Sequence, residues 1–289
     1  MKLSNVWVFF FFVWSVSFAV GAEAAWRPLF NGKDLSGWEV FLGVPFASSQ
    51  IPGAERDATG NYVKPLGVNN DPTHIVSVVD VDGRPAIHLG PQAPGGVATL
   101  ESFSNYHMRF QFKWGERTKD QRPGQARNAG LLYYAFGQRG DVQGKWMHSL
   151  QFQIKEGFTG DLVVMGDALA DLRANKIDAK RVGYDPAAEI VTFGNKLPLT
   201  PYCTKTGKDY EKPVSEWNTL EIYAVGDSAV QIVNGQVALR LTGSRKIVGD
   251  GFAALKGGRI ELQMEGWDIF FRDIEIKSVT EIPAEYAAP

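Results

Sequence analysis

One stretch near the middle of the chain alternates apolar and polar side chains, and this pattern favours an extended strand. The stretch is Met147–Glu156. Because successive side chains of a strand point to opposite faces, its apolar set is predicted to face a core and its polar set to face solvent. The apolar set is Leu150, Phe152 and Ile154, and the polar set is Ser149, Gln151, Gln153 and Lys155. A polar row spaced at roughly 6 to 7 Å suits sugar hydroxyls, although many half-exposed strands carry Gln and Lys without any function.

Similar strand signals recur along the chain and predict an all-β protein. They cover Ile75–Val81, Ala86–Leu89, His107–Trp114, Asn128–Phe136, Trp217–Val225, Ala229–Val233, Gln236–Leu241, Arg259–Glu265 and Phe270–Ile276. A short helix is predicted near Asp167–Lys176, and the aperiodic stretch Val44–Asp71 is predicted to be a long loop on the rim of a sheet. The pairs Gly95-Gly96 and Gly257-Gly258 are expected to form turns. The strand count and the polar rows predict an antiparallel jelly-roll β-sandwich with long loops.

The beginning of the chain has the features of an export signal. One Lys precedes an apolar run over Val6–Val20, and small residues follow up to Ala25. The run is shorter than the roughly 20 residues that a membrane-spanning helix needs, so residues 1–22 are predicted to be a cleavable signal peptide. The mature protein is then expected in the periplasm or outside the cell, without a membrane span. Residues 26–280 show no low-complexity linker and are predicted to form a single domain.

Composition excludes several classes of partner and site. The net charge of -2 and the pI near 6.1 provide no basic field for nucleic acid or anionic membranes. Cys203 is the only cysteine, which excludes an internal disulfide and any cysteine-based metal cluster. The four histidines are dispersed, which disfavours a histidine-rich metal site. A divalent cation such as calcium, held by carbonyls and carboxylates of the loops, remains an open alternative.

Several motifs resemble those of the 3-keto-disaccharide hydrolase family. The first is the turn-rich opening Phe30–Trp38, and the others are Asn128–Gly130, His148–Glu156, Gly160–Asp161, Glu216–Thr219, Leu262–Gly266 and Phe271–Ile274. The resemblance covers nearly all of the chain after the predicted signal peptide. It implies a concanavalin-type or laminin-G-like jelly roll and a carbohydrate substrate whose 3-hydroxyl has been oxidised to a ketone.

This resemblance implies a particular chemistry. A ketone at C3 acidifies the proton on C2, so a base can remove that proton while the glycosidic oxygen leaves C1 by β-elimination; water can then add back. Either hydrolysis or elimination results. Such a site needs a base, an acid for the leaving group, and donors or a metal ion for the enolate oxygen. It does not need two carboxylates at glycosidase spacing.

The predicted polar rows supply the candidate residues. The base is predicted to be His148 or Glu265, because each carries a titratable group near the end of a polar row. Each could instead be a structural residue. The candidates for substrate binding are Arg109, Lys113, Asn128, Gln151, Gln153, Lys155 and Gln263.

One departure from the family pattern leaves two functional hypotheses open. Related sequences have the pattern Glu-x-Gln where this chain has Gln151 before Gln153. An amide cannot act as a general base, and it is a weaker metal ligand than a carboxylate. The chain is therefore interpreted either as an exported enzyme that cleaves 3-keto-glycosides or as a non-catalytic carbohydrate-binding module of the same fold. The sequence does not specify the sugar, the linkage or the oligomeric state.

Overall fold

The computed structural model describes residues 24–116, 124–178, 181–196, 198–205, 207 and 209–287. The predicted signal peptide, residues 1–22, lies outside this part of the chain. Among the described residues, no helix has the length and apolar character needed to cross a membrane. The described helix is α1 (Ala284–Ala287), close to the C-terminus.

Two antiparallel sheets make up almost all of the described structure. The twelve-stranded sheet contains, in spatial order, β12 (Val182–Tyr184), β11 (Ala168–Lys176), β17 (Gln236–Val248), β16 (Ser228–Val233), β15 (Asn218–Val225), β7 (Tyr106–Trp114), β20 (Ile269–Ser278), β5 (Arg84–Leu89) and β4 (Val76–Val81). Three short strands are added to it: β1 (Arg27–Pro28), β13 (Ile190–Gly194) and β18 (Gly251–Ala254). The eight-stranded sheet contains β14 (Tyr202–Cys203), β10 (Leu162–Met165), β9 (His148–Lys155), β8 (Asn128–Phe136), β19 (Arg259–Met264), β6 (Gly95–Thr99), β2 (Trp38–Leu42) and β3 (Gly67–Val68).

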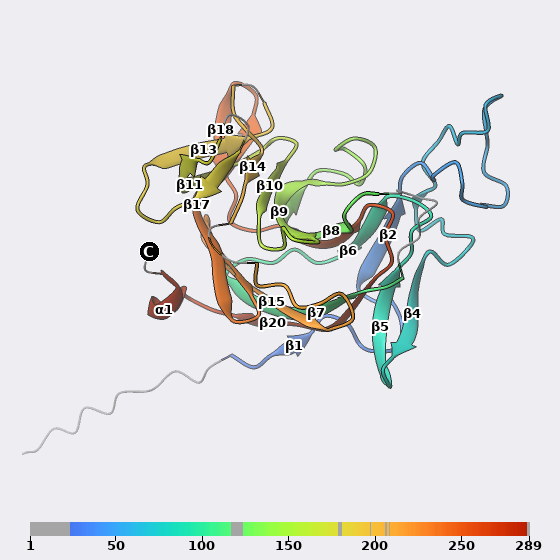
Figure 1. Cartoon of the computed structure of the whole chain (residues 1–289), viewed down its shortest axis with the longest axis horizontal. Coiled ribbons are helices and arrows are strands. Elements are labelled where there is room, and N and C mark those ends of the chain that lie inside the picture. The colour runs from blue at the N-terminus through green and yellow to red at the C-terminus, as the bar shows by residue number, and fades with distance from the viewer. Residues whose placement is uncertain are drawn as a thin grey trace, which may run out of the picture.

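The core lies between these two sheets, which form two layers with β6, β8 and β9 on one side and β7, β15 and β20 on the other (Figure 1). Phe110 and Phe112 of β7 belong to the same buried cluster as Leu150 and Phe152 of β9. These side chains occupy alternate positions of their strands, as the sequence pattern predicts. The architecture confirms the prediction of an antiparallel jelly-roll sandwich.

The helix predicted near Asp167–Lys176 is wrong, because this stretch forms β11. Its Ala, Leu, Arg and Lys residues are good helix formers. However, its buried side chains recur with a period of two, and the strand pairs with both β13 and β17. The buried positions are Ala168, Ala170, Leu172 and Ala174. Pairing on both edges and burial of one face thus outweigh the local helix preference.

A second correction concerns Gly95-Gly96, which was expected to be a turn and instead begins strand β6. A Cβ atom on Gly95 would lie 2.2 Å from the carbonyl oxygen of Phe41, and one on Gly96 would lie 2.4 Å from that of Leu262. The two neighbouring strands therefore approach β6 too closely for any side chain here. Glycine is required by close backbone contact and not by a turn.

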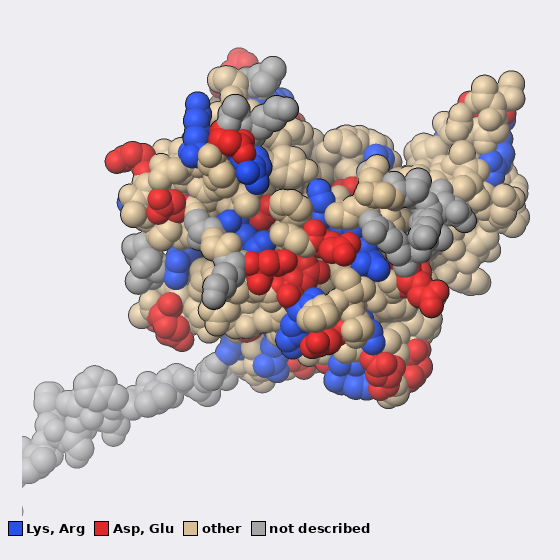
Figure 2. All heavy atoms as spheres, viewed as in Figure 1, with Lys and Arg blue, Asp and Glu red and all other residues tan. Residues whose placement is uncertain are grey.

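The long loop predicted over Val44–Asp71 is present and carries the short strand β3, which pairs with the edge strand β2. The loop is held by its own contacts: the Arg56 guanidinium lies 3.9 Å from the ring centroid of Tyr62 and donates hydrogen bonds to three backbone carbonyls. In Figure 1 this region, drawn in blue, extends away from the sandwich. On the molecular face in Figure 2, acidic and basic side chains lie side by side.

Candidate functional site

Five polar side chains are joined by hydrogen bonds across the face of the eight-stranded sheet that points away from the core; we call this surface the polar face. Gln151 Nε2 donates to Gln153 Oε1, and Gln153 Nε2 donates to Asn128 Oδ1 at 3.1 Å. Asn128 Nδ2 donates to Glu265 Oε2 at 2.7 Å, and Gln263 Nε2 donates to Glu265 Oε1 at 3.0 Å. We call these five residues the amide chain. The structure therefore brings together five of the residues predicted from the sequence.

Strand register explains why these side chains can lie flat across the sheet. Gly130 of β8 stands between Gln153 and Gln263, and Gly96 flanks Gln263 on its other side. A Cβ atom on Gly130 would lie 2.5 Å from Nε2 of Gln151. The missing side chain at Gly130 therefore provides the space that the Gln151 amide occupies.

The prediction that this row faces solvent is wrong for its central members. Gln151 is 2% exposed and Gln153 is 3% exposed. Residues 137–147, which we call the cover loop, fold over this part of the sheet, and Val142 and Trp146 of the loop pack in a second buried cluster. Its other members are Leu132, Val163 and Met165. The apolar and polar sides alternate as predicted, but the loop that connects β8 to β9 covers part of the polar side.

Glu265 stands at the half-buried end of the amide chain, and both of its carboxylate oxygens accept hydrogen bonds from side-chain amides. These bonds fix the orientation of a group that can accept a proton. Tyr202 of β14 lies on the same face of the sheet, because it pairs with Val163, which pairs in turn with Gln151. Burial raises the pKa of its phenol, and the negative charges of Glu265 and Asp161 add to this effect. Its side chain remains 54% exposed. Tyr202 was missed in the sequence, because nothing in the two-residue strand β14 indicates which face it joins.

The structure separates His148 from Glu265. Strand pairing places His148 opposite Phe136 and Lys155 opposite Asn128, so the two ends of β9 are roughly 23 Å apart. His148 Nδ1 accepts the N–H of Asp167 at 2.9 Å, and the ring stacks on Phe136 at 5.1 Å. Because Glu265 bonds to Asn128 at the other end, the two candidate bases cannot act on the same atom.

Arg109 and Lys113 lie on the opposite side of the molecule from the amide chain. They belong to β7, on the face of the twelve-stranded sheet that points away from the core; we call this surface the charged face. Arg109 forms an ion pair with Glu275 at 2.8 Å, and Lys113 pairs with Asp82 at 3.0 Å. A pocket of about 340 Å³ opens beside Arg109. The two residues share the predicted strand geometry but not the candidate site.

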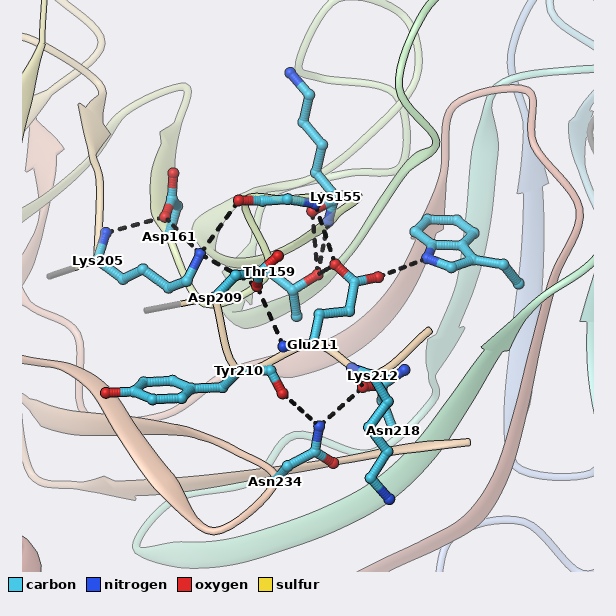
Figure 3. Close-up of polar contacts among 12 residues, drawn as sticks. Lys155, Thr159, Asp161, Lys205, Asp209, Tyr210, Glu211, Lys212, Asn218 and Asn234 are labelled. Carbon is cyan, nitrogen blue, oxygen red and sulfur yellow. Dashed lines mark hydrogen bonds and ion pairs between the residues drawn. The ribbon is translucent and has the colours of Figure 1, made fainter. Parts of the chain in front are cut away.

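Lys155 marks the end of β9, next to a polar cluster that connects the two sheets (Figure 3). Its backbone N–H donates to Thr159 Oγ1 at 3.2 Å. Glu211 accepts hydrogen bonds from Thr159 at 3.0 Å and from Trp114 of β7 at 2.8 Å, and burial raises the pKa of its carboxyl. Burial also raises the pKa of Asp161 to about 6. This cluster holds the irregular segment after β14 against the end of the sandwich.

Glu261 is a further carboxyl group on the polar face that the candidate list omitted. It stands on β19 beside Leu132 of β8 and is 1% exposed. Burial raises its pKa to about 7, although the positive charge of Arg139 and a hydrogen bond from the Met147 N–H lower it. The alternation of Arg259–Glu265 placed Glu261 in the same row as Gln263. Its burial could not be read from that pattern, so nothing in the sequence distinguished it from a surface glutamate.

The described residues contain no group of three or more His, Cys, Asp or Glu side chains arranged to hold a metal ion. The amide chain offers carboxylate and amide oxygens at Glu265 and Asn128, and these are ligand types that calcium accepts. Their hydrogen bonds to each other already use these oxygens. The calcium hypothesis therefore stays a prediction.

Comparisons with known proteins identify relatives of the sequence and of the fold. The sequence matches the 3-keto-alpha-glucoside-1,2-lyase-like domain over residues 25–277. No curated protein sequence is similar at a significant level. A Parabacteroides distasonis protein assigned to the glycosyl hydrolases superposes with a TM-score of 0.45 and 15% identity, over 88% of this chain and 100% of that chain. The carbohydrate-binding module CBM66 of Bacillus subtilis superposes with a TM-score of 0.40 and 8% identity, over 70% of this chain and 92% of that chain. LamAcat of Zobellia galactanivorans superposes with a TM-score of 0.43 and 10% identity, over 90% of this chain and 99% of that chain.

Proposed function

This chain belongs to the 3-keto-alpha-glucoside-1,2-lyase-like domain family, and from that membership we propose that it cleaves the glycosidic bond of 3-keto-glycosides or 3-keto-disaccharides. The family points to a carbohydrate-active domain. The 3-keto substrate and the choice between hydrolysis and elimination are parts of this proposal. The observation that carries it is the oriented Glu265 carboxylate at the half-buried end of the amide chain.

Glu265 is the base in this proposal. Both of its oxygens are held by amide N–H groups, and the carboxylate takes the proton from C2 of the 3-keto sugar. The exposed ring of Tyr202 provides an apolar surface and a hydroxyl on the same face of the sheet. Asn128 and Gln263 orient the base through their hydrogen bonds to it, and Gln153 holds Asn128 in place. Arg109 and Lys113 take no part. His148, at the far end of β9, is assigned a structural role through Phe136 and Asp167.

The test is the release of the second sugar from 3-keto-trehalose and related 3-keto-disaccharides by the purified mature protein. Glu265→Gln is expected to lower turnover by about 10²- to 10⁴-fold, the range that a positioned base contributes. His148→Ala is the matched comparison and is expected to keep most of the activity. A fully active Glu265→Gln protein would contradict the choice of base. The same assay with EDTA, followed by addition of calcium, tests the cation hypothesis.

Gln151 supports a second candidate function, a carbohydrate-binding module without turnover. An amide occupies the position where the resemblance to the family implies a carboxylate, and this amide is buried and bonded to Gln153. If the missing carboxylate explains a lost activity, Gln151→Glu is expected to raise turnover by about 10²- to 10⁴-fold. Sugar binding without turnover in the wild type and in Gln151→Glu would favour the binding module.

Export and domain organisation complete the proposal. The apolar run Val6–Val20 supports export to the periplasm or the medium by a signal peptide spanning residues 1–22. The mature segment 26–280 is proposed to fold as a single domain. Mass spectrometry of the exported protein gives the cleavage site, and the same sample analysed by light scattering gives the oligomeric state. An intact N-terminus in the exported protein would contradict the signal peptide.

A further inference from the structure

Three buried polar atoms have no hydrogen-bond partner among the described residues and lie in one neighbourhood beneath the cover loop. They are Glu261 Oε2, Arg139 Nη2 and Trp146 Nε1. Most buried polar atoms in folded proteins have a partner, so three such atoms close together indicate a place for a polar ligand or for water. Two are N–H donors and one is a carboxyl oxygen.

Several contacts establish that these groups are neighbours. The Met147 N–H donates to the Glu261 carboxyl, and the charge of Arg139 acts on the same carboxyl. Arg139 Nη1 contacts the sulfur of Met147 at 2.7 Å. Trp146 precedes Met147 and packs with Leu132, which is the cross-strand neighbour of Glu261. The cover loop therefore brings both donors to the carboxyl group of β19.

The charges around Glu261 are arranged to accept a second negative charge. Arg139 Nε forms an ion pair with Glu39 at 2.7 Å, and Arg259 lies 3.7 Å from the same carboxylate. When Glu261 is protonated, Arg139 and Arg259 therefore face a single carboxylate, that of Glu39. When Glu261 is ionised, the two cations face two carboxylates. Burial raises the pKa of Glu261 to about 7, so both forms are populated near neutral pH.

We propose that Glu261 is the general acid that protonates the leaving glycosidic oxygen, with Arg139 stabilising the carboxylate that remains. This inference rests on the proposed function and deepens it. Glu261 and Glu265 stand on the same face of the chain four residues apart, roughly 13 Å between Cα atoms, with the buried Gln263 between them. Once the cover loop has lifted, a sugar that lies over Gln263 would face both carboxyl groups. A base at Glu265 and an acid at Glu261 take the place of the carboxylate pair of an ordinary glycosidase.

The step balances between the two carboxyl groups. Glu265 takes the proton from C2, and the electron pair of that C–H bond forms the C1=C2 double bond as the bond from C1 to the glycosidic oxygen breaks. The leaving oxygen takes its proton from Glu261 Oε2. Glu265 ends protonated and Glu261 ends ionised opposite Arg139. Exchange of both protons with water restores the starting state before the next substrate binds.

Substrate access to Glu261 requires the cover loop to lift. The loop contains three glycines in the left-handed region: Gly137 with φ of 79°, Gly140 with φ of 83° and Gly144 with φ of 69°. Gly140 also lies against the ring of Phe41, where a Cβ atom would approach to 2.7 Å. The closed position of the cover loop therefore depends on close contacts such as that of Gly140 with Phe41, which a single substitution at the glycine would disturb.

The test compares two leaving groups in wild type and Glu261→Gln, using 3-keto-trehalose and 4-nitrophenyl 3-keto-glucoside. A sugar needs a proton to leave, whereas nitrophenolate does not. We expect Glu261→Gln to lose about 10²- to 10⁴-fold in kcat on 3-keto-trehalose and to keep most of its activity on the nitrophenyl substrate. Glu101→Gln, which removes a surface carboxylate paired with Arg27 at 2.9 Å, is the control and should match the wild type on both.

Each outcome of this comparison decides the proposal. Equal loss on both substrates would indicate a structural role and overturn it, as would full activity on 3-keto-trehalose. A wild type that is inactive on both substrates would refute the proposed function and this inference together, whereas an active wild type with an unaffected variant would refute only the inference. Arg139→Gln, expected to reproduce the leaving-group dependence, provides a second variant if Glu261→Gln folds poorly.

Discussion

The polar face and the charged face arise from the same sequence pattern but differ in what surrounds them. On the polar face, amides and carboxyl groups are buried and bonded to one another beneath a loop. On the charged face, Arg109 and Lys113 form ion pairs with partners that remain partly exposed. Water screens the second set, whereas the first set lies where each hydrogen bond and each charge has a large effect. The candidate chemistry belongs to the covered face for this reason.

Among the variants that test the difference between the two faces, the largest expected change in the free energy of unfolding comes from placing a charge in the amide chain. Gln151→Glu puts a carboxylate between Leu132 and Val163 without a cation bonded to it. We expect the free energy of unfolding to fall by about 3–5 kcal/mol at pH 8, because an uncompensated buried charge is strongly unfavourable. Denaturant unfolding at pH 8 and pH 5 measures this, and the loss should be smaller at pH 5, where the carboxyl can be protonated. Equal stability of the variant and wild type at pH 8 would show that water reaches this position.

The pH dependence of the free energy of unfolding tests whether Glu261 is buried in the folded protein. Its pKa is raised from 4.5 to about 7, so the unfolded chain ionises first as pH rises, and the folded state loses relative stability between pH 4.5 and 7. The contribution is fully present below pH 4.5 and amounts to about 3 kcal/mol at one 1.36 kcal/mol step per pKa unit. Glu261→Gln should remove this part of the decline. Asp161 contributes a similar decline in both proteins, so the difference between their pH profiles is the measurement; parallel profiles would refute the prediction.

Truncation of one buried amide is expected to have a smaller effect. Gln153→Ala breaks the bonds to Gln151 and Asn128 and leaves buried groups without partners, which should lower the free energy of unfolding by about 1–3 kcal/mol. Lys155→Ala, at the next polar position of β9, is half-buried and should change it by less than about 0.5 kcal/mol. Thermal unfolding of both variants compares them. Similar small shifts would mean that the row faces solvent after all.

The smallest effects are expected on the charged face. Arg109→Ala and Lys113→Ala each remove one partly exposed ion pair, and each should lower the free energy of unfolding by about 0.2–1 kcal/mol. Their KM for a 3-keto-disaccharide should equal that of the wild type, because they stand on the other side of the sandwich. A KM raised tenfold in either variant would place substrate on the charged face. Raising the salt concentration should reduce the stability differences further.

The sequence predicted the strands and their inward faces because this information is local. Met108, Phe110 and Phe112 are buried, as are Leu150 and Phe152, because period-two alternation against one core fixes which side each residue takes. The same rule placed Gln151, Gln153 and Gln263 together on one kind of surface. The same rule did not identify β11, because this stretch is rich in good helix formers and was predicted to be a helix. Its alternating side chains became significant only through the pairing of the strand with β13 and β17.

The sequence by itself determined which side chains share a strand face, that the fold is an antiparallel sandwich, and which family the chain resembles. Only the tertiary structure decided which polar face is covered, that His148 and Glu265 stand at opposite ends of β9, and that Glu261 meets Arg139. The physical reason is that burial and electrostatic coupling depend on segments far apart in the chain. The cover loop at residues 137–147 reaches β19 more than a hundred residues later.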